Sequence, residues 1–215
     1  YLIKNLFIGK ICHKNTCSSC NNETYRDEDF KSITLDVKNM KNINDSFEKY
    51  ISSEDIEDYN CSNCNNKVNI KRSTLLSSLP NILVIHLNRI IFDFENGTGN
   101  IIKINSRFEF PIELNLKKYC LESNVRETKN IYEKKDEYYK YELRGIIIHR
   151  GDVQGHYASI ITVDKDKWYK FLDSSVKEFN INNLEEECFG GIDQNTKEEK
   201  RNSAYLLFYE ISKKK

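Results

Sequence analysis

Two segments decide the fold of this chain: Gly155-His-Tyr157 and Trp168-Tyr-Lys-Phe-Leu-Asp173. Apolar side chains alternate with polar ones through residues 156–163 and again through 167–173, and a period of two residues is typical of β-strands. The two runs therefore predict a β-hairpin that carries His156 on one strand and Asp173 on the other. A histidine beside a carboxylate is the general-base half of a nucleophile–histidine–acid constellation.

The register of this hairpin determines which side chain faces His156. A two-residue turn at Asp164-Lys165 would place His156 directly opposite Asp173, with the Cβ atoms about 5 Å apart. A four-residue loop keeps the same faces, whereas a three-residue loop would put Leu172 on the face of the histidine. A lone histidine in a sheet is commonly a core residue. The position of His156 at a loop-to-strand junction is what favours catalysis.

The rest of the chain predicts a sheet-dominated α+β fold without internal repeats. Alternating or continuous apolar runs indicate strands at residues 30–37, 68–74, 82–87, 141–149 and 203–211. Helical spacing is confined to residues 45–56, which open with a capping-box pattern at Asp45–Glu48, and to residues 181–188. Residues 93–99 are expected to form a loop, and the polar segment 121–140 a solvated loop or surface helix.

Composition excludes several classes of function. The 215 residues suffice for a buried core, and 33 basic side chains balance 33 acidic ones. A net charge of zero argues against nucleic acid as the main partner, because phosphate binding needs a basic field. No apolar run has the length of a membrane span. The start of the chain, a strand-like run at residues 1–8, lacks the features of a signal peptide. We expect the C-terminal part of a larger protein.

Four of the seven cysteines form two Cys-x-x-Cys pairs, Cys17 with Cys20 and Cys61 with Cys64. Two thiolates on such a tight turn can both bind one Zn²⁺ at about 2.3 Å, and four thiolates leave no open position for water. The pairs predict a structural zinc site that joins two distant hairpins. They also indicate a reducing compartment, the cytoplasm or the nucleus. Four reduced core cysteines without metal are the alternative, and Cys12 or His13 could replace a ligand.

In their order along the chain, these motifs resemble the ubiquitin-specific proteases, a family of cysteine deubiquitinases. The resemblance runs from end to end. Its segments include Tyr59-Asn-Cys-Ser-Asn-Cys64, Leu79-Pro-Asn-Ile-Leu-Val-Ile-His-Leu-Asn-Arg89, Ile102-Lys-Ile-Asn-Ser-Arg-Phe-Glu-Phe-Pro111, Gly155-His-Tyr157 and Ala204-Tyr-Leu-Leu-Phe-Tyr209. It implies part of a thumb–palm–fingers fold. Residues 1–80 would be zinc-binding β fingers, and residues 81–215 a papain-like cysteine protease palm.

The resemblance also implies roles for single residues. His156 would be the general base, and Tyr157 a residue near the channel for the ubiquitin C-terminal tail. Asp173 is expected to be the orienting acid because an even-numbered turn would place it opposite His156. The loops 93–99 and 150–154 would cover that tail. The implied partners are ubiquitin and ubiquitinated proteins. The implied cofactor is a fingertip zinc ion held by Cys17, Cys20, Cys61 and Cys64.

Two departures from the family pattern bear on activity. The nucleophilic cysteine of the family lies upstream of the fingers, so we expect residues 1–215 alone to be inert. We expect the nucleophile in an upstream part of the same catalytic domain. Leu172 stands where the family usually has an acid or amide, and leucine cannot accept a hydrogen bond from an imidazole. Loss of the orienting acid costs up to about 10⁴-fold in rate. A catalytically inactive ubiquitin-binding module is therefore the competing hypothesis.

Overall fold

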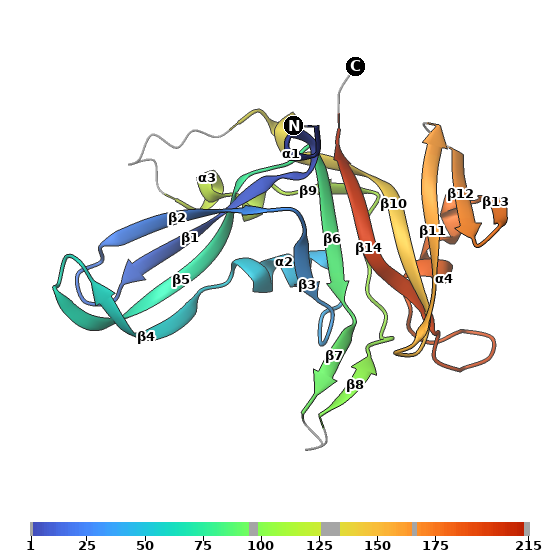
Figure 1. The fold of residues 1–215 in the computed structure, drawn as a ribbon, viewed down its shortest axis with the longest axis horizontal. Helices are drawn as coiled ribbons and strands as arrows, with labels where there is room; N and C mark the ends of the chain where they lie inside the picture. Colours follow the sequence, from blue (N-terminus) through green and yellow to red (C-terminus); the bar gives the residue numbers. More distant parts are fainter. Residues whose placement is uncertain (1, 95–98, 126–133, 165–166, 213–215) are drawn as a thin grey trace.

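The computed structural model describes residues 2–94, 99–125, 134–164 and 167–212. They form two larger β-sheets and one two-stranded sheet (Figure 1). Parts of the expected loops at 93–99 and 121–140, and Lys165 of the expected turn, lie outside the described residues. No helix of the described chain is long and apolar enough to cross a membrane.

The largest sheet, here called the palm sheet, has eight strands. Seven of them follow one another in the order β13-β12-β11-β10-β14-β6-β3, and β9 pairs with the start of β10. Only β3 and β6 are parallel neighbours. The strands are β3 Ile33–Asp36, β6 Ile82–Asn88, β9 Glu113–Asn115, β10 Lys140–Gly151, β11 Gly155–Asp164, β12 Lys167–Leu172, β13 Ser175–Phe179 and β14 Asn202–Ile211.

The second sheet, here called the fingers sheet, extends away from the palm sheet (Figure 1). Its order is β2-β1-β5-β4, and every neighbouring pair is antiparallel. Its strands are β1 Gly9–Cys17, β2 Glu23–Phe30, β4 Glu54–Cys61 and β5 Asn66–Ser78. A separate hairpin, β7 Ile90–Asp93 with β8 Asn100–Lys103, continues beyond the end of β6.

The two sheets do not divide the chain at residue 80, where the sequence suggested a boundary. The fingers sheet comes from residues 9–30 and 54–78. Strand β3 joins the palm sheet, and helix α2, Ile43–Ile51, contributes to the same hydrophobic core as the palm strands. The chain therefore enters the palm sheet between the two fingers hairpins.

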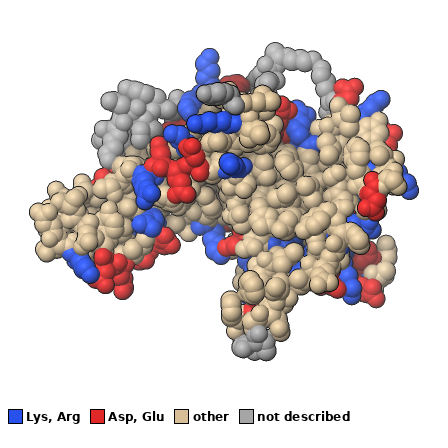
Figure 2. Space-filling model, viewed as in Figure 1, with Lys and Arg blue, Asp and Glu red and all other residues tan. Residues whose placement is uncertain are grey.

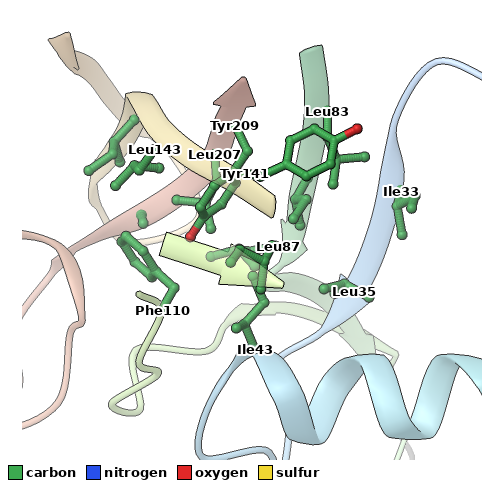
Figure 3. Close-up of a cluster of buried hydrophobic side chains, with 14 of the residues drawn as sticks. Ile33, Leu35, Ile43, Leu83, Leu87, Phe110, Tyr141, Leu143, Leu207 and Tyr209 are labelled. Atoms are coloured by element: carbon green, nitrogen blue, oxygen red, sulfur yellow. The ribbon is translucent and has the colours of Figure 1, made fainter. Parts of the chain in front are cut away.

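The hydrophobic core packs one face of the palm sheet against α2 and the irregular segments beside it (Figure 3). Alternate residues of β6, namely Leu83, Ile85 and Leu87, are fully buried, and each such side chain contributes about 1.5–3 kcal/mol when removed from water. From α2, Phe47 stacks on Tyr119 with ring centroids 4.7 Å apart.

The remaining helices are short. They are α1 Leu2–Phe7, α3 Leu121–Asn124 and α4 Leu184–Cys188, with 3₁₀ turns η1 Lys117–Tyr119, η2 Asp136–Tyr139 and η3 Ile181–Asn183.

Two local expectations are wrong. Residues 2–7 form α1 and not a strand; the spacing of Ile3, Leu6 and Phe7 is that of one helical face. Helix α2 begins after Asn42, whose side chain accepts hydrogen bonds from the amides of Asn44 and Asp45. The N-cap is thus an asparagine, and no capping box forms at Asp45. The helix ends at Ile51, because residues 54–56 belong to β4.

Candidate active site and metal centre

His156 lies at the start of β11, at the end of the palm sheet. Main-chain pairing places Arg150 opposite His156 and Gly151 opposite Gly155. A Cβ atom on Gly155 would lie 2.1 Å from the carbonyl oxygen of Arg150 and 3.0 Å from Nε2 of His149. Any other residue would force the two strands apart, since no real Cβ comes so close to a backbone oxygen. Glycine therefore allows this close approach. The next side chain, that of His156, is exposed at the strand end.

Of the two registers that the sequence left open, the structure has the one that places Leu172, and not Asp173, on the face of His156. The ladder between β11 and β12 runs from Ser159 opposite Phe171 to Thr162 opposite Trp168, and it shifts at Val163 before Asp164 meets Lys167. Val163 is an extra residue on β11. It shifts the register by one, so that the side chains which an even-numbered turn would place on one face of the sheet lie on the other. Continued toward the strand ends, this register puts Leu172 opposite Ala158, on the face that His156 shares.

Asp173 itself lies in the turn between β12 and β13. Its φ is +49°, in the left-handed region, and the turn is closed by the pairing of Leu172 with Ser175. Among the described residues, no hydrogen bond joins Asp173 to His156. The role of Asp173 as the orienting acid therefore stays a prediction.

Aromatic rings surround the base of the His156 hairpin. His149 is buried, and its ring lies 5.1 Å from that of Tyr157 and 6.2 Å from that of Tyr205. Burial, and secondarily the charge of Lys103, lowers the pKa of His149 below its usual value, which favours the neutral imidazole. Tyr157 is 51% exposed. The exposed histidine thus stands beside a cluster of one histidine and two tyrosine rings that meet edge to face or at a tilt.

None of the cysteines outside the two pairs has the character of a nucleophile. Cys12, Cys120 and Cys188 are each at most 1% exposed. Burial raises the pKa of Cys12 to about 11 and that of Cys188 to about 12, and it raises the pKa of Cys120 as well. A thiol of that kind is inert, because the thiolate is the reactive form.

The four paired cysteines come together at one end of the fingers sheet. Their Sγ atoms all lie within 4.8 Å of one another. Cys17 Sγ is 3.8 Å from Cys64 Sγ, and Cys20 Sγ is 3.9 Å from Cys61 Sγ. Four sulfurs at about 2.3 Å from a tetrahedral ion would be about 3.8 Å apart. The cluster therefore fits a four-thiolate zinc site, whereas unrelated core cysteines have no reason to match that spacing.

The two cysteine turns have the same backbone geometry. In each, the asparagine after the second cysteine has a left-handed backbone, with φ of +55° at Asn21 and +53° at Asn65. Its amide donates to the carbonyl of the first cysteine, Cys17 at 3.0 Å and Cys61 at 2.9 Å. Asparagine adopts this conformation readily. The side chain of Asn63 and the backbone amide of Asn22 lower the pKa of Cys20 to about 6. The neighbouring Cys20 thiol, and then burial, raise the pKa of Cys64 to about 12, so the hydrogen bonds favour one thiolate in the cluster, and a bound metal would favour the others.

Two cations near the hairpin, one buried and one half-buried, were not identified from the sequence. Arg89 is fully buried, and its guanidinium donates to the carbonyls of Ala204, Ile104 and Ser106 at 2.8–3.1 Å. Lys103 donates to the carbonyls of three further residues. Main-chain carbonyls carry no sequence signature. Only the presence of a lone cation in each of the apolar runs 82–91 and 101–104 could have suggested these roles.

The fold and the cysteine cluster match those of the catalytic domain of ubiquitin-specific proteases. The sequence model of the family "Ubiquitin carboxyl-terminal hydrolase" matches residues 1–209, and the chain belongs to that family.

Individual relatives agree with this assignment. The chain is 34% identical over 218 residues to ubiquitin carboxyl-terminal hydrolase 5 of Schizosaccharomyces pombe, covering 96% of this chain and 19% of the relative. It is 32% identical to human ubiquitin carboxyl-terminal hydrolase 24, covering 97% of this chain and 9% of the relative. The chain thus spans a fifth or less of these relatives.

A solved structure shares the fold. It is a chain of the SAGA Ubp8/Sgf11/Sus1/Sgf73 DUB module bound to ubiquitin aldehyde, with a TM-score of 0.78 and 26% sequence identity. The match covers all of this chain and 43% of the other.

Proposed function

We propose that this chain binds ubiquitin and supplies the histidine half of the active site of a thiol-dependent deubiquitinase. The observation that carries the proposal is His156, exposed at the end of a hairpin that only glycine at position 155 permits. The family and the ubiquitin-bound structural neighbour support ubiquitin as the partner. Tyr157, half-exposed beside the histidine, would contact the C-terminal tail of ubiquitin.

In the proposed reaction, a cysteine outside residues 1–215 is the nucleophile. His156 accepts the thiol proton, and the thiolate attacks the carbonyl carbon of the isopeptide bond. The C–N bond breaks, and the protonated imidazole gives its proton to the departing lysine amine. His156 then deprotonates a water molecule, which hydrolyses the thioester and frees the ubiquitin carboxylate and the thiol. Asp173 is proposed to orient the imidazole.

An upstream part of the same catalytic domain is proposed to carry this cysteine and to pack on the open face of the palm sheet. That face holds a groove of about 520 Å³ lined mostly by apolar residues, including Phe7, Ile147, Ile161 and Phe208. Figure 2 shows a broad area free of charged side chains over β6, β14 and β10. An apolar face of this size needs a cover. The 43% coverage of the structural neighbour leaves room for one.

A structural zinc ion is proposed in the fingers, held by Cys17, Cys20, Cys61 and Cys64. When bound, it would cross-link the two fingers hairpins and would take no part in bond cleavage, because four thiolates close its coordination shell. Thiolates persist in a reducing compartment, so we also propose the cytoplasm or the nucleus as the location.

A non-catalytic ubiquitin-binding module is the second candidate, because the register places Leu172 and not a carboxylate on the face of His156. An unoriented imidazole is a poor base. In that case the chain would still bind ubiquitin through the same fold, but would not form a thioester.

The test uses the full-length protein that contains this chain. Ubiquitin carrying a C-terminal electrophile is added, and the intact mass is followed with time for the wild-type protein and for His156→Ala. A one-to-one adduct that forms much more slowly in the variant would establish the thiol mechanism. A folded protein that binds ubiquitin without forming an adduct would establish the binding module instead.

A further inference from the structure

Lys103, the last residue of β8, binds three main-chain carbonyl groups with one nitrogen. Its Nζ atom lies 2.6 Å from the oxygen of Arg201, 2.7 Å from that of Gly151 and 3.2 Å from that of His149. An ammonium group has three donors, so this arrangement uses all of them. The acceptors belong to the end of β10 and to the segment before β14, which are distant from Lys103 in sequence.

Two of these carbonyls flank the residue that pairs with the candidate base. Arg150 lies opposite His156 in the β10–β11 ladder, and Lys103 holds the residues on either side of it, His149 and Gly151. The amide of Gly151 also donates to the carbonyl of Arg201 at 3.0 Å. The end of β10, which lies opposite His156, is therefore held to β8 and to the segment before β14 by the Lys103 ammonium group.

The charge of Lys103 is not neutralised by a paired carboxylate. Among the described residues, none lies within ion-pair distance of its Nζ. Burial, and then the charge of Arg89, lower its pKa to about 8, while the charges of Asp152 and Glu199 raise it. Keeping a charged lysine partly out of water without an ion pair costs free energy. The three hydrogen bonds to main-chain carbonyls offset this cost.

We propose that Lys103 is a positioning residue for His156, which fixes the end of β10 and thereby the place from which the imidazole reaches the nucleophile. This inference rests on the proposed function, in which His156 is the general base. Errors of about 1 Å in the position of such a group cost about 10²-fold in rate, so a mobile strand end would lower turnover while leaving distant ubiquitin contacts intact.

The test compares variants of the full-length protein. Lys103→Met keeps the length of the side chain and removes all three donors. Lys103→Arg keeps the charge, but a flat guanidinium cannot place three donors where one nitrogen stands. The matched control is Lys49→Met, which loses an exposed ion pair of 2.8 Å with Asp36. Hydrolysis of ubiquitin with a fluorogenic C-terminal amide gives kcat and KM, and hydrogen exchange reports on residues 149–157.

We expect kcat to fall about 10- to 100-fold in Lys103→Met, with KM within about threefold of wild type. The kcat of Lys103→Arg should lie between those of Lys103→Met and the wild type. The kcat of Lys49→Met should equal that of the wild type. Exchange at 149–157 should quicken only in the Lys103 variants. Loss of activity as the ammonium deprotonates, near pH 8, should be seen in the wild type and be absent in Lys103→Met. The titratable and charged groups around this ammonium are His149, Asp152, Arg89 and Glu199.

Two results would overturn this inference and leave the proposed function intact. One is a Lys103→Met protein with wild-type kcat, and the other is faster hydrogen exchange at residues 149–157 in Lys103→Met without any loss of kcat. If Lys103→Met does not fold, Lys103→Arg decides, because wild-type kcat and exchange in that variant would also overturn it. A wild-type protein that binds ubiquitin but shows no thiol-dependent hydrolysis would overturn the proposed function, and this inference with it.

Discussion

At the scale of single residues, the approach of β10 to β11 depends on the missing side chain of Gly155. In the full-length protein, Gly155→Ala must move either the Arg150 carbonyl or the histidine, since its Cβ would lie 2.1 Å from that oxygen. We expect kcat/KM with a fluorogenic ubiquitin substrate to fall about 100-fold or more. The control is Gly145→Ala on the neighbouring strand β10, where a Cβ would be in ordinary van der Waals contact, 3.7 Å from Phe208 and 3.9 Å from the carbonyl oxygen of Ile160. Equal rates for the two variants would contradict this account.

Leu172 offers a second test at this scale. The β11–β12 register puts position 172 on the His156 face, so Leu172→Asp would supply a hydrogen-bond acceptor there. Because an orienting carboxylate is worth up to about 10⁴-fold, we expect kcat to rise by about 10-fold or more. Leu172→Ala removes the same side chain without adding an acceptor and should not raise kcat. Equal kcat for Leu172→Asp and the wild type would show that the imidazole is already oriented, by Asp173 or another group.

At the scale of elements, the cysteine turns connect the two hairpins of the fingers sheet. Metal binding at such a cluster is folding free energy. Treatment of this chain with a strong chelator should therefore speed hydrogen exchange in β1, β2, β4 and β5, while the core strands of the palm sheet stay protected. Cys20→Ser should reproduce the effect without chelator, and Ser19→Ala should not. Zinc content is measured in parallel by elemental analysis. Unchanged exchange together with absent zinc would refute the metal site.

The sequence was informative where a strand has one buried face or where a motif is local. Alternation predicted a strand at residues 68–74 and a nearly continuous apolar run predicted one at 82–87; they lie within β5 and β6. The two Cys-x-x-Cys motifs located the cluster. The irregularity at Val163 could not be foreseen, because Asp164-Lys165 has no strong turn preference. The positions of Arg89 and Lys103 could not be foreseen either, since their partners are carbonyls far away in the chain.

At the scale of the whole molecule, the buried thiols and phenols make stability depend on alkaline pH. Burial raises the pKa values of Cys188, Cys120, Tyr141 and Tyr209. The unfolded chain releases these protons at lower pH than the folded one. The stabilisation that they give is therefore complete below pH 9, the ordinary value for the thiols, and is lost as the pH rises further. Lys103 and Arg89 have the opposite sign, because burial lowers their pKa values to about 8 and about 10, but the thiols and phenols with raised pKa values outnumber them.

The last prediction isolates one of these groups. Cys188 titrates at about 12 in the fold against 9.0 for an ordinary thiol, so at about pH 10.5 the unfolded state gains about 2 kcal/mol from its ionisation. Cys188→Val fills a similar volume and has no proton to lose. Urea unfolding of both proteins at pH 8 and pH 10.5 should show the wild type losing about 2 kcal/mol more than the variant. Equal losses would mean that Cys188 is solvated in the fold and that the palm core is less tightly packed around α4 than its complete burial implies.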